Sequence, residues 1–353
     1  MRVETLLPLG KVDPGLRAPE TPFDITSAAE QARLVEALGY DRLVIEETKD
    51  DPFVVLAAAA SATTTLGLGT SVAIAFPRSP TSMALTAWSM QKLSGGRFAL
   101  GLGSQVKGHI ERRYGMRWSG PAAWMRDYVL ALRGVWHAWQ HGAPLDVDTP
   151  HYRLNLMVPL FDPGPIDEPE IPVLLAAVNP MMCSVAGEVA DGIRPHPVCT
   201  PSYIADVMLP AVRAGAASGG RSLDAFTVNM KPLVATAPDD EQLVTKVRDA
   251  RARLAFYCST PGYRAAFEHF GLGDLADEAK VLSKQQRWEE LPPLITDDVL
   301  HEFVTIGTYD TIGEQILARY GAVVTHCEVS IAVRDEADRA ALAAIVTDLH
   351  ADG

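Results

Sequence analysis

The chain has 353 residues, of which 48% are hydrophobic and 21% are charged. This apolar fraction excludes an intrinsically disordered protein, and the length allows one large domain or two medium ones. With 31 Lys and Arg against 44 Asp and Glu, the net charge is −13. An acidic chain argues against nucleic acid as a partner, because nucleic-acid binding needs a basic surface. The four cysteines show no CxxC spacing, which predicts a reduced protein without a metal site.

The sequence gives no sign of membrane insertion or export. No stretch approaches the roughly 18 to 20 consecutive apolar residues that a membrane helix requires. The N-terminal sequence MRVETLLPLG lacks the basic start and the long apolar region of a signal peptide. We therefore expect a soluble, cytoplasmic protein that does not bind membranes.

Strand-like and helix-like segments alternate along almost the whole chain. The predicted strands cover 2–8, 41–46, 66–74, 97–103, 171–178, 191–194, 226–235 and 325–333. The predicted helices that follow them cover 27–39, 52–62, 80–93, 121–140, 180–190, 201–217, 239–256 and 335–349. Helix boundaries carry the expected residues, such as Pro52 in a first turn and Gly39 after a last turn.

Eight strands, each followed by a helix, predict a parallel sheet, and that number favours a (β/α)8 TIM barrel over an open doubly wound sheet. The predicted fold class is therefore α/β, with one barrel domain over residues 1–353. Segments 141–170 and 261–306 exceed the minimal repeating unit. We expect both to be insertions at the C-terminal face of the barrel, where catalytic residues usually lie.

Polar residues follow the second predicted strand, and glycines interrupt the third. Glu47 and Thr48 come directly after strand 41–46. They could hydrogen-bond the head group of a cofactor, or they could belong to a solvated loop that precedes the next helix. Glycines within 67–72 are typical of a bulge or of close backbone approach by a ligand, and tight barrel packing would explain them equally well.

The fourth, fifth and sixth strands also end in candidate site residues. The fourth strand runs into Gly101-Leu102-Gly103-Ser104-Gln105, a turn whose backbone N–H groups could hold an anion. This is no dinucleotide fingerprint, because the third glycine and the ribose-binding acid are missing. His109 follows that turn, Asn179 follows the fifth strand and His196 follows the sixth. No HExxH or GxSxG motif offers a competing chemistry.

Three stretches of the sequence carry a resemblance to a known family. They are Gly39-Tyr40-Asp41, then 68–72 with the run LSGGRFALGLG at 93–103, and finally IPV at 171–173 with ADG at 190–192. With them the sequence resembles the bacterial-luciferase-like superfamily of flavin and deazaflavin enzymes, above all the branch that uses coenzyme F420. The similarity is strongest over 27–217. The segments 47–53 and 104–107 also resemble an actinobacterial subgroup.

The resemblance implies a barrel with an isoalloxazine-like ring laid across the strand ends. It also implies a non-prolyl cis peptide between Ser71 and Val72, which supports the ring from behind. The phosphate-bearing tail of the cofactor would lie over two turns, at 104–105 and 178–179. The cofactor-binding residues that it implies are Glu47, Ser71, Val72, Ser104, Gln105, Val178, Asn179, Met181 and Met182.

The sequence departs from this family at two catalytic positions. The F420-dependent sugar-phosphate dehydrogenases of the family have a catalytic His after the second strand and a Glu after the fourth-strand glycines, whereas this sequence has Thr48 and Val106. Oxidation of a sugar phosphate is therefore not expected. A proton relay would instead use His109 or His196, then Glu47, with Thr48 bridging through its hydroxyl.

We therefore predict an F420-dependent oxidoreductase that transfers a hydride between the deazaflavin and a small, hydrophobic carbonyl, alcohol or enone substrate. The alternatives are an FMN-dependent monooxygenase of a two-component system and a non-catalytic cofactor-binding protein. Family analogy leads us to expect a homodimer. Tyr263 and Trp288 in the second insertion would cover the substrate. The expected apolar walls are Phe76, Met116, Trp118 and Met157.

Overall fold

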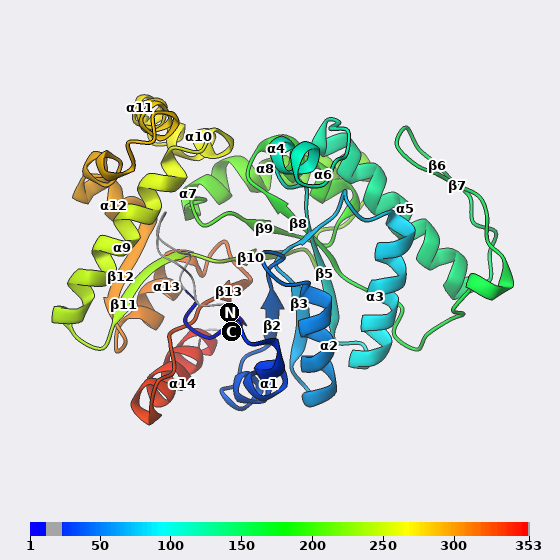
Figure 1. Ribbon diagram of the computed structural model, residues 1–353, viewed down its shortest axis with the longest axis horizontal. Coiled ribbons are helices and arrows are strands. Elements are labelled where there is room, and N and C mark those ends of the chain that lie inside the picture. The colour runs from blue at the N-terminus through cyan, green and yellow to red at the C-terminus, as the bar shows by residue number, and fades with distance from the viewer. Residues whose placement is uncertain (12–22, 352–353) are drawn as a thin grey trace.

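The computed structural model describes residues 1–11 and 23–351. Its centre is a closed barrel of parallel strands surrounded by helices (Figure 1). The barrel strands are β1 (Arg2–Leu6), β2 (Arg42–Ile45), β3 (Gly67–Thr70), β4 (Ala73–Ile74), β5 (Phe98–Gly103), β8 (Val173–Ala177), β9 (Gly192–Pro195), β10 (Thr227–Met230) and β13 (His326–Glu328). β3 and β4 share one position, because both pair with β5 and so close the barrel. The predicted eight-stranded (β/α)8 barrel is confirmed.

The helices begin and end where local sequence signals place them. The Asp51 side chain accepts a hydrogen bond from the Phe53 N–H and caps a helix that starts at Pro52, and Gly95 ends the next helix at φ +63°. The helices are α1 (Ala28–Ala37), α2 (Pro52–Ala62), α3 (Pro80–Ser94), α4 (Lys107–Arg112), α5 (Pro121–His141), α6 (Pro180–Val189), α7 (Pro201–Tyr203), α8 (Leu209–Gly219), α9 (Asp240–Cys258), α10 (Arg264–Glu268), α11 (Gly273–Lys284), α12 (Asp297–Phe303), α13 (Ile312–Tyr320) and α14 (Glu336–His350).

The third predicted strand, 66–74, is divided by a bulge. The peptide bond between Ser71 and Val72 is cis, as the family resemblance implies. β3 ends before this bond and β4 begins after it. Gly101 of β5 packs directly against the end of β3, where a Cβ atom would lie well inside contact distance of the Thr70 carbonyl oxygen. The bulge and strand β5 therefore fit together only because β5 has a glycine, Gly101, at the point of contact.

The seventh predicted strand, 226–235, is wrong in its length. β10 stops at Met230, and the chain leaves the barrel at Pro232, which has no N–H to donate to a strand ladder. Beyond it, β11 (Leu233–Ala237) pairs in parallel with β12 (Val304–Thr308). Strand β12 begins inside the insertion 261–306, which was predicted to add only helical turns. Figure 1 shows this small sheet with α9 and α12 at one side of the barrel.

The other predicted insertion, 141–170, contains the short hairpin of β6 (Val147–Asp148) and β7 (Arg153–Leu154). It extends on the side of the barrel opposite to α9 (Figure 1). The last predicted strand, 325–333, is also shorter than expected, because β13 covers only His326–Glu328. These differences leave the order of the barrel strands unchanged.

All four cysteines are buried and free. Burial raises the pKa of Cys183 and of Cys258 to about 12, so these thiols stay protonated at neutral pH. Within residues 1–11 and 23–351, no helix is both long and apolar enough to cross a membrane.

The contact between β3 and β5 is open to a direct test. We expect Gly101→Ala to destabilise the protein by at least about 3 kcal/mol, because the new methyl group must displace the backbone of β3. Gly262→Ala is the matched control, since a Cβ atom at Gly262 meets nothing within 4 Å. Urea unfolding of both variants measures the difference. Equal stability of the two variants would contradict this account of the bulge.

Candidate active site

A cavity of about 530 Å³ opens at the C-terminal ends of the barrel strands. Its size lies within the range of roughly 300–1,000 Å³ that small-molecule sites occupy. It is bordered by the ends of six barrel strands and by two tyrosines from the last turn of α9 and the segment after it. The predicted site residues that line it are Glu47, Thr48, Ser71, Val72, Ser104, Gln105, Val178, Asn179, Met181, Met182 and His196.

His109, the other predicted proton donor, lies elsewhere. It is exposed on α4 and is not among the residues that line the cavity. In the second insertion, Tyr263 lines the cavity. Trp288 does not line it, and its indole N–H donates to the Gln286 side chain at 3.3 Å.

The apolar side chains expected to form the substrate walls also serve other purposes. Phe76 is buried and stacks on Trp124 with ring centroids 3.7 Å apart. Met116 and Trp118 pack against the hydrophobic core. Met157 lines a separate hollow beside α3 and α5. The prediction that these residues line the cavity is wrong, because their hydrophobicity is used in packing.

Glu47 ties the end of β2 to the chain after the bulge. Its two carboxylate oxygens accept hydrogen bonds from Arg78 Nη1 at 2.8 and 2.7 Å, and one of them accepts the Ile74 N–H at 2.7 Å. Arg78 also pairs with Asp51 at 2.9 Å. Glu47 borders the cavity, but proton transfer to it would disrupt this ion pair.

The bulge residue Ser71 connects the cavity to a charged cluster beneath it. Its hydroxyl accepts a hydrogen bond from Arg194 Nε at 3.1 Å and donates to Glu328 Oε2 at 3.4 Å. Val72, on the other side of the cis bond, presents its side chain to Gly103 on the neighbouring strand. The bulge is therefore supported from the interior of the barrel by ionic groups.

Glu4 of β1 is the centre of this cluster and is fully buried. It accepts hydrogen bonds from Arg42 Nη1 at 2.8 Å, from Arg194 Nη2 at 2.9 Å and from Asn229 Nδ2 at 2.9 Å. Burial alone would raise the pKa of Glu4, but the two arginines outweigh it and lower that pKa to about 2. Glu4 is therefore ionised throughout the physiological pH range.

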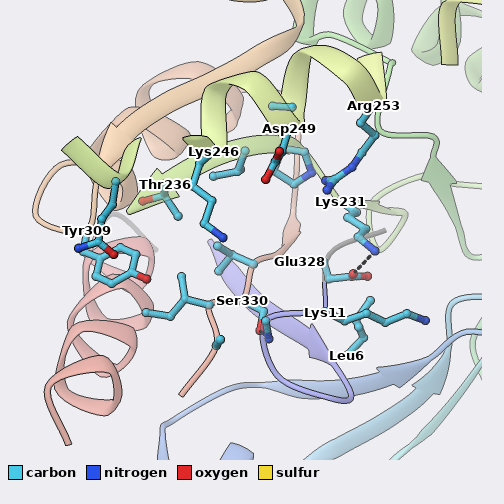
Figure 2. Close-up of a pocket in the computed structure, with 18 of the residues that line it drawn as sticks. Leu6, Lys11, Lys231, Thr236, Lys246, Asp249, Arg253, Tyr309, Glu328 and Ser330 are labelled. Carbon is cyan, nitrogen blue, oxygen red and sulfur yellow. Dashed lines mark hydrogen bonds and ion pairs between the residues drawn. The ribbon is translucent and has the colours of Figure 1, made fainter. Parts of the chain in front are cut away.

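Lys231 joins the cavity to a second, smaller hollow. Its ammonium lies 3.0 Å from Glu46 Oε1 and 3.5 Å from Glu328 Oε1. Burial raises the pKa of Glu328, against the opposing charges of Lys231 and Arg194. The second hollow, of about 200 Å³, lies between α9, β11 and the segment after β13, and Lys231 and Glu328 line its inner end (Figure 2).

His196 stands at the end of β9 against two aromatic rings. Its imidazole stacks on Tyr263 with centroids 3.8 Å apart and meets Tyr257 edge-on at 4.7 Å. Its Nδ1 atom accepts the Val198 N–H at 3.4 Å, so the neutral imidazole carries its proton on Nε2. These contacts hold the ring at the cavity wall.

Sequence reasoning missed Asn229, Lys231 and Tyr257 as cavity residues and included Arg194 only within the predicted strand 191–194. A signal was available for Arg194 and Asn229, because each is a polar residue inside a short apolar strand, GIRP for Arg194 and TVNM for Asn229. Within the described part of the chain, no three His, Cys, Asp or Glu side chains are grouped so that they could hold a metal ion.

The sequence profile of the luciferase-like monooxygenase family matches residues 1–326. The chain belongs to this family. It is 40% identical to an uncharacterized protein of Mycobacterium tuberculosis, over 87% of this chain and 88% of that protein. It is 26% identical to 5,10-methylenetetrahydromethanopterin reductase of Archaeoglobus fulgidus, over 80% and 83% of the two chains.

The structure also resembles solved members of the luciferase-like family. The coenzyme F420-dependent tetrahydromethanopterin reductase of Methanopyrus kandleri superposes with a TM-score of 0.74 over 99% of this chain and 97% of that chain. At 20% sequence identity this similarity concerns the fold. In this luciferase-like chain, Thr48 and Val106 both border the cavity.

The buried His326, next to Glu4 in the barrel interior, predicts a pH dependence of stability. Burial lowers its pKa from 6.5 to about 4, so below pH 6.5 the unfolded chain binds a proton that the folded chain does not. The free energy of unfolding should therefore fall by about 2 kcal/mol between pH 7.5 and pH 5 through this residue. Glu4, whose pKa is lowered from 4.5, adds its own loss only at lower pH.

His326→Gln tests this assignment by urea unfolding at both pH values. The variant should lose that part of the pH dependence, whatever its absolute stability. The same change in unfolding free energy in both proteins would show that His326 is not the responsible group.

Proposed function

We propose that this protein is an F420-dependent oxidoreductase that transfers a hydride between the deazaflavin and a small, hydrophobic carbonyl, alcohol or enone substrate. The observation that carries the proposal is the lining of the cavity, which combines small side chains beside the cis bond with the buried polar residues Arg194 and Asn229. The similarity to methylenetetrahydromethanopterin and F420-dependent reductases supports the choice of cofactor.

The cavity residues around the cis bond have small side chains or none. A Cβ atom at Gly103 would lie 2.6 Å from Val72 Cγ2 and 3.8 Å from Ala176 Cβ, so any larger residue would disturb this surface. The buried residues Arg194 and Asn229 also line the cavity, and Arg194 contacts the bulge through Ser71. Flavins and deazaflavins have a planar ring with one polar edge, which fits both features.

The rim offers a place for the remainder of the cofactor. Gln105 adopts φ +55°, and its side chain accepts the Val106 N–H at 2.9 Å, which shapes the turn after β5. The neighbouring turn after β8 begins α6. We propose that both turns hold the phosphate-bearing tail. The residues concerned are Ser104, Gln105, Val178, Asn179, Met181 and Met182.

The bound deazaflavin would supply the hydride, and the protein would orient the reactants and handle one proton. Glu46, Glu47, Arg194 and Lys231 all line the cavity and each takes part in an ion pair. Proton transfer through any of them would break that pair. His196 lies against two aromatic rings at the cavity wall, and imidazole is the side chain that most often serves as a general acid or base. We therefore place His196 first among the proton donors.

A titration with F420 and, separately, with FMN tests the choice of cofactor. We expect F420 to quench the intrinsic tryptophan fluorescence with a micromolar or lower Kd, at least about tenfold below that of FMN. Preference for FMN would favour a two-component monooxygenase. Failure of both to bind would overturn the proposal.

A panel of histidine variants tests the proton donor with reduced F420 and a set of ketones and enones. His196→Gln should lower kcat by about 10²- to 10⁴-fold with little change in the Kd of F420, as expected for a lost general acid. His301→Gln on exposed α12 is the matched control and should retain full activity. His109→Gln decides the remaining alternative, because a larger loss there than in His196→Gln would transfer the role to His109.

A further inference from the structure

Three polar side chains at α5 and the β6–β7 hairpin form a hydrogen-bonded chain. The Ser119 hydroxyl lies 3.0 Å from His151 Nε2, and His151 Nδ1 lies 2.7 Å from Asp127 Oδ2. Ser119 comes shortly before α5, Asp127 lies within α5, and His151 lies in the turn between β6 and β7. None of the three is among the residues that line the cavity at the strand ends. The proposed function therefore makes no use of them.

The hydrogen-bond partners of His151 determine where its neutral ring carries the proton. A carboxylate only accepts hydrogen bonds, so Nδ1 donates to Asp127 Oδ2. The proton of the neutral imidazole then lies on Nδ1, and Nε2 is left as an acceptor. Ser119 therefore donates its hydroxyl proton to Nε2. This order of groups, with this direction of the hydrogen bonds, activates a serine as a nucleophile.

The surroundings of His151 hold its ring in this orientation. Asp127 is 3% exposed, and its Oδ2 atom also accepts the backbone N–H of His151 at 3.3 Å. The imidazole lies nearly parallel to the Trp124 ring, with centroids 6.0 Å apart. Trp124 is itself fixed, because its indole N–H donates to the Tyr152 hydroxyl at 2.7 Å. The Asp127 carboxylate thus faces the ring on which positive charge appears when His151 accepts a proton.

Ser119 and His151 are open to solvent, and backbone donors follow them closely in the chain. Both residues are half-buried, and 21% of the His151 side chain is exposed. The N-cap residue of α5 is a glycine, so no cap side chain occupies the N–H groups of Ala122 and Ala123. The N-terminus of a helix carries partial positive charge, which suits an oxyanion. Pro121 and Ala122 also line the cavity, whose edge therefore lies within a few residues of Ser119.

We propose that Ser119, His151 and Asp127 form a second active centre, which hydrolyses small carboxylic esters. Ser119 Oγ attacks the ester carbonyl carbon while its proton passes to His151 Nε2, and the first turn of α5 stabilises the oxyanion. The bond from that carbon to the alcohol oxygen then breaks, and the alcohol leaves with the proton from Nε2. Water attacks the acyl-serine in the same way and releases the carboxylic acid. Nothing is oxidised or reduced, so this activity is independent of F420.

Labelling with a fluorophosphonate in the absence of any cofactor tests whether Ser119 is nucleophilic, because this reagent reacts with activated serines. We expect a single phosphonyl group, which peptide mass spectrometry locates on Ser119. Ser119→Ala and His151→Gln should each lower the labelling rate by about 100-fold or more. Ser27→Ala is the matched control and should be labelled like the wild-type protein. Ser27 is also a half-buried serine before a helix, but its hydroxyl donates to the Asp24 carbonyl oxygen.

Hydrolysis of p-nitrophenyl acetate tests turnover. The wild-type protein should release nitrophenol in a burst that reports the acyl-serine, and Ser119→Ala should lower the rate by about 100-fold or more. Asp127 is a positioning residue, and Asp127→Asn keeps its size but removes its charge. We expect this variant to lower kcat by about 100-fold with little change in KM, whereas a merely structural role would leave kcat of the folded protein unchanged.

A cysteine at position 119 keeps the test decisive if Asp127→Asn does not fold. The four native cysteines are buried, so they contribute little background. Iodoacetamide should alkylate the thiol of Ser119→Cys at least about tenfold faster than the thiol of the double variant Ser119→Cys, His151→Gln, because the imidazole withdraws the thiol proton.

Three results would overturn the proposal. The first is equal labelling of the wild-type protein and Ser119→Ala, and the second is alkylation of Ser119→Cys at the same rate with and without His151. The third is ester hydrolysis by the wild-type protein no faster than by Ser119→Ala, which would show that the three residues only connect the hairpin to α5. None of these results depends on whether the protein binds F420, so the proposed function is tested separately.

Discussion

The ion pair between Glu4 and Arg194 organises the interior of this barrel. A buried carboxylate loses its hydration, and only close, well-oriented partners compensate for that loss. The Glu4 carboxylate on β1 accepts hydrogen bonds from Arg194 on β9 and from Asn229 on β10. Arg194 also donates a hydrogen bond from Nε to the Ser71 hydroxyl in the bulge. Removing either charge would leave the other buried with only part of its compensation, from Arg42 for Glu4 and from Glu328 for Arg194. The pair therefore links the stability of the barrel to the shape of the cavity floor.

The sequence predicted the barrel because its signals are local. Runs of apolar residues ended by glycine or proline identified the strands, and their alternation with helices determined the topology. The path of the chain after β10 could not be predicted in this way. The run 226–235 is apolar on both sides of Lys231, and nothing local shows that β11 pairs with a strand about 70 residues later. That choice is made by tertiary packing.

The site shows the same division between local and long-range information. Residues directly after the strands, such as Thr48, Ser104 and His196, were found because the carboxyl ends of parallel strands meet at one face. His109 is exposed on α4 and is not among the residues that line the cavity, which the positions of the strand ends alone do not reveal. The importance of Arg194 was missed because its partner Glu4 is 190 residues away in the sequence.

The cavity also limits the kind of substrate that this chain can use. Thr48 and Val106 at the rim carry no charge, and the cationic groups of Arg194 and Lys231 lie in the floor, where carboxylates pair with them. An anionic substrate would have to compete with those carboxylates in a protein whose net charge is −13. A neutral substrate meets no such competition, and the tyrosine rings beside His196 offer it apolar contact. These electrostatics support the proposal of a neutral substrate over an anionic one such as a sugar phosphate.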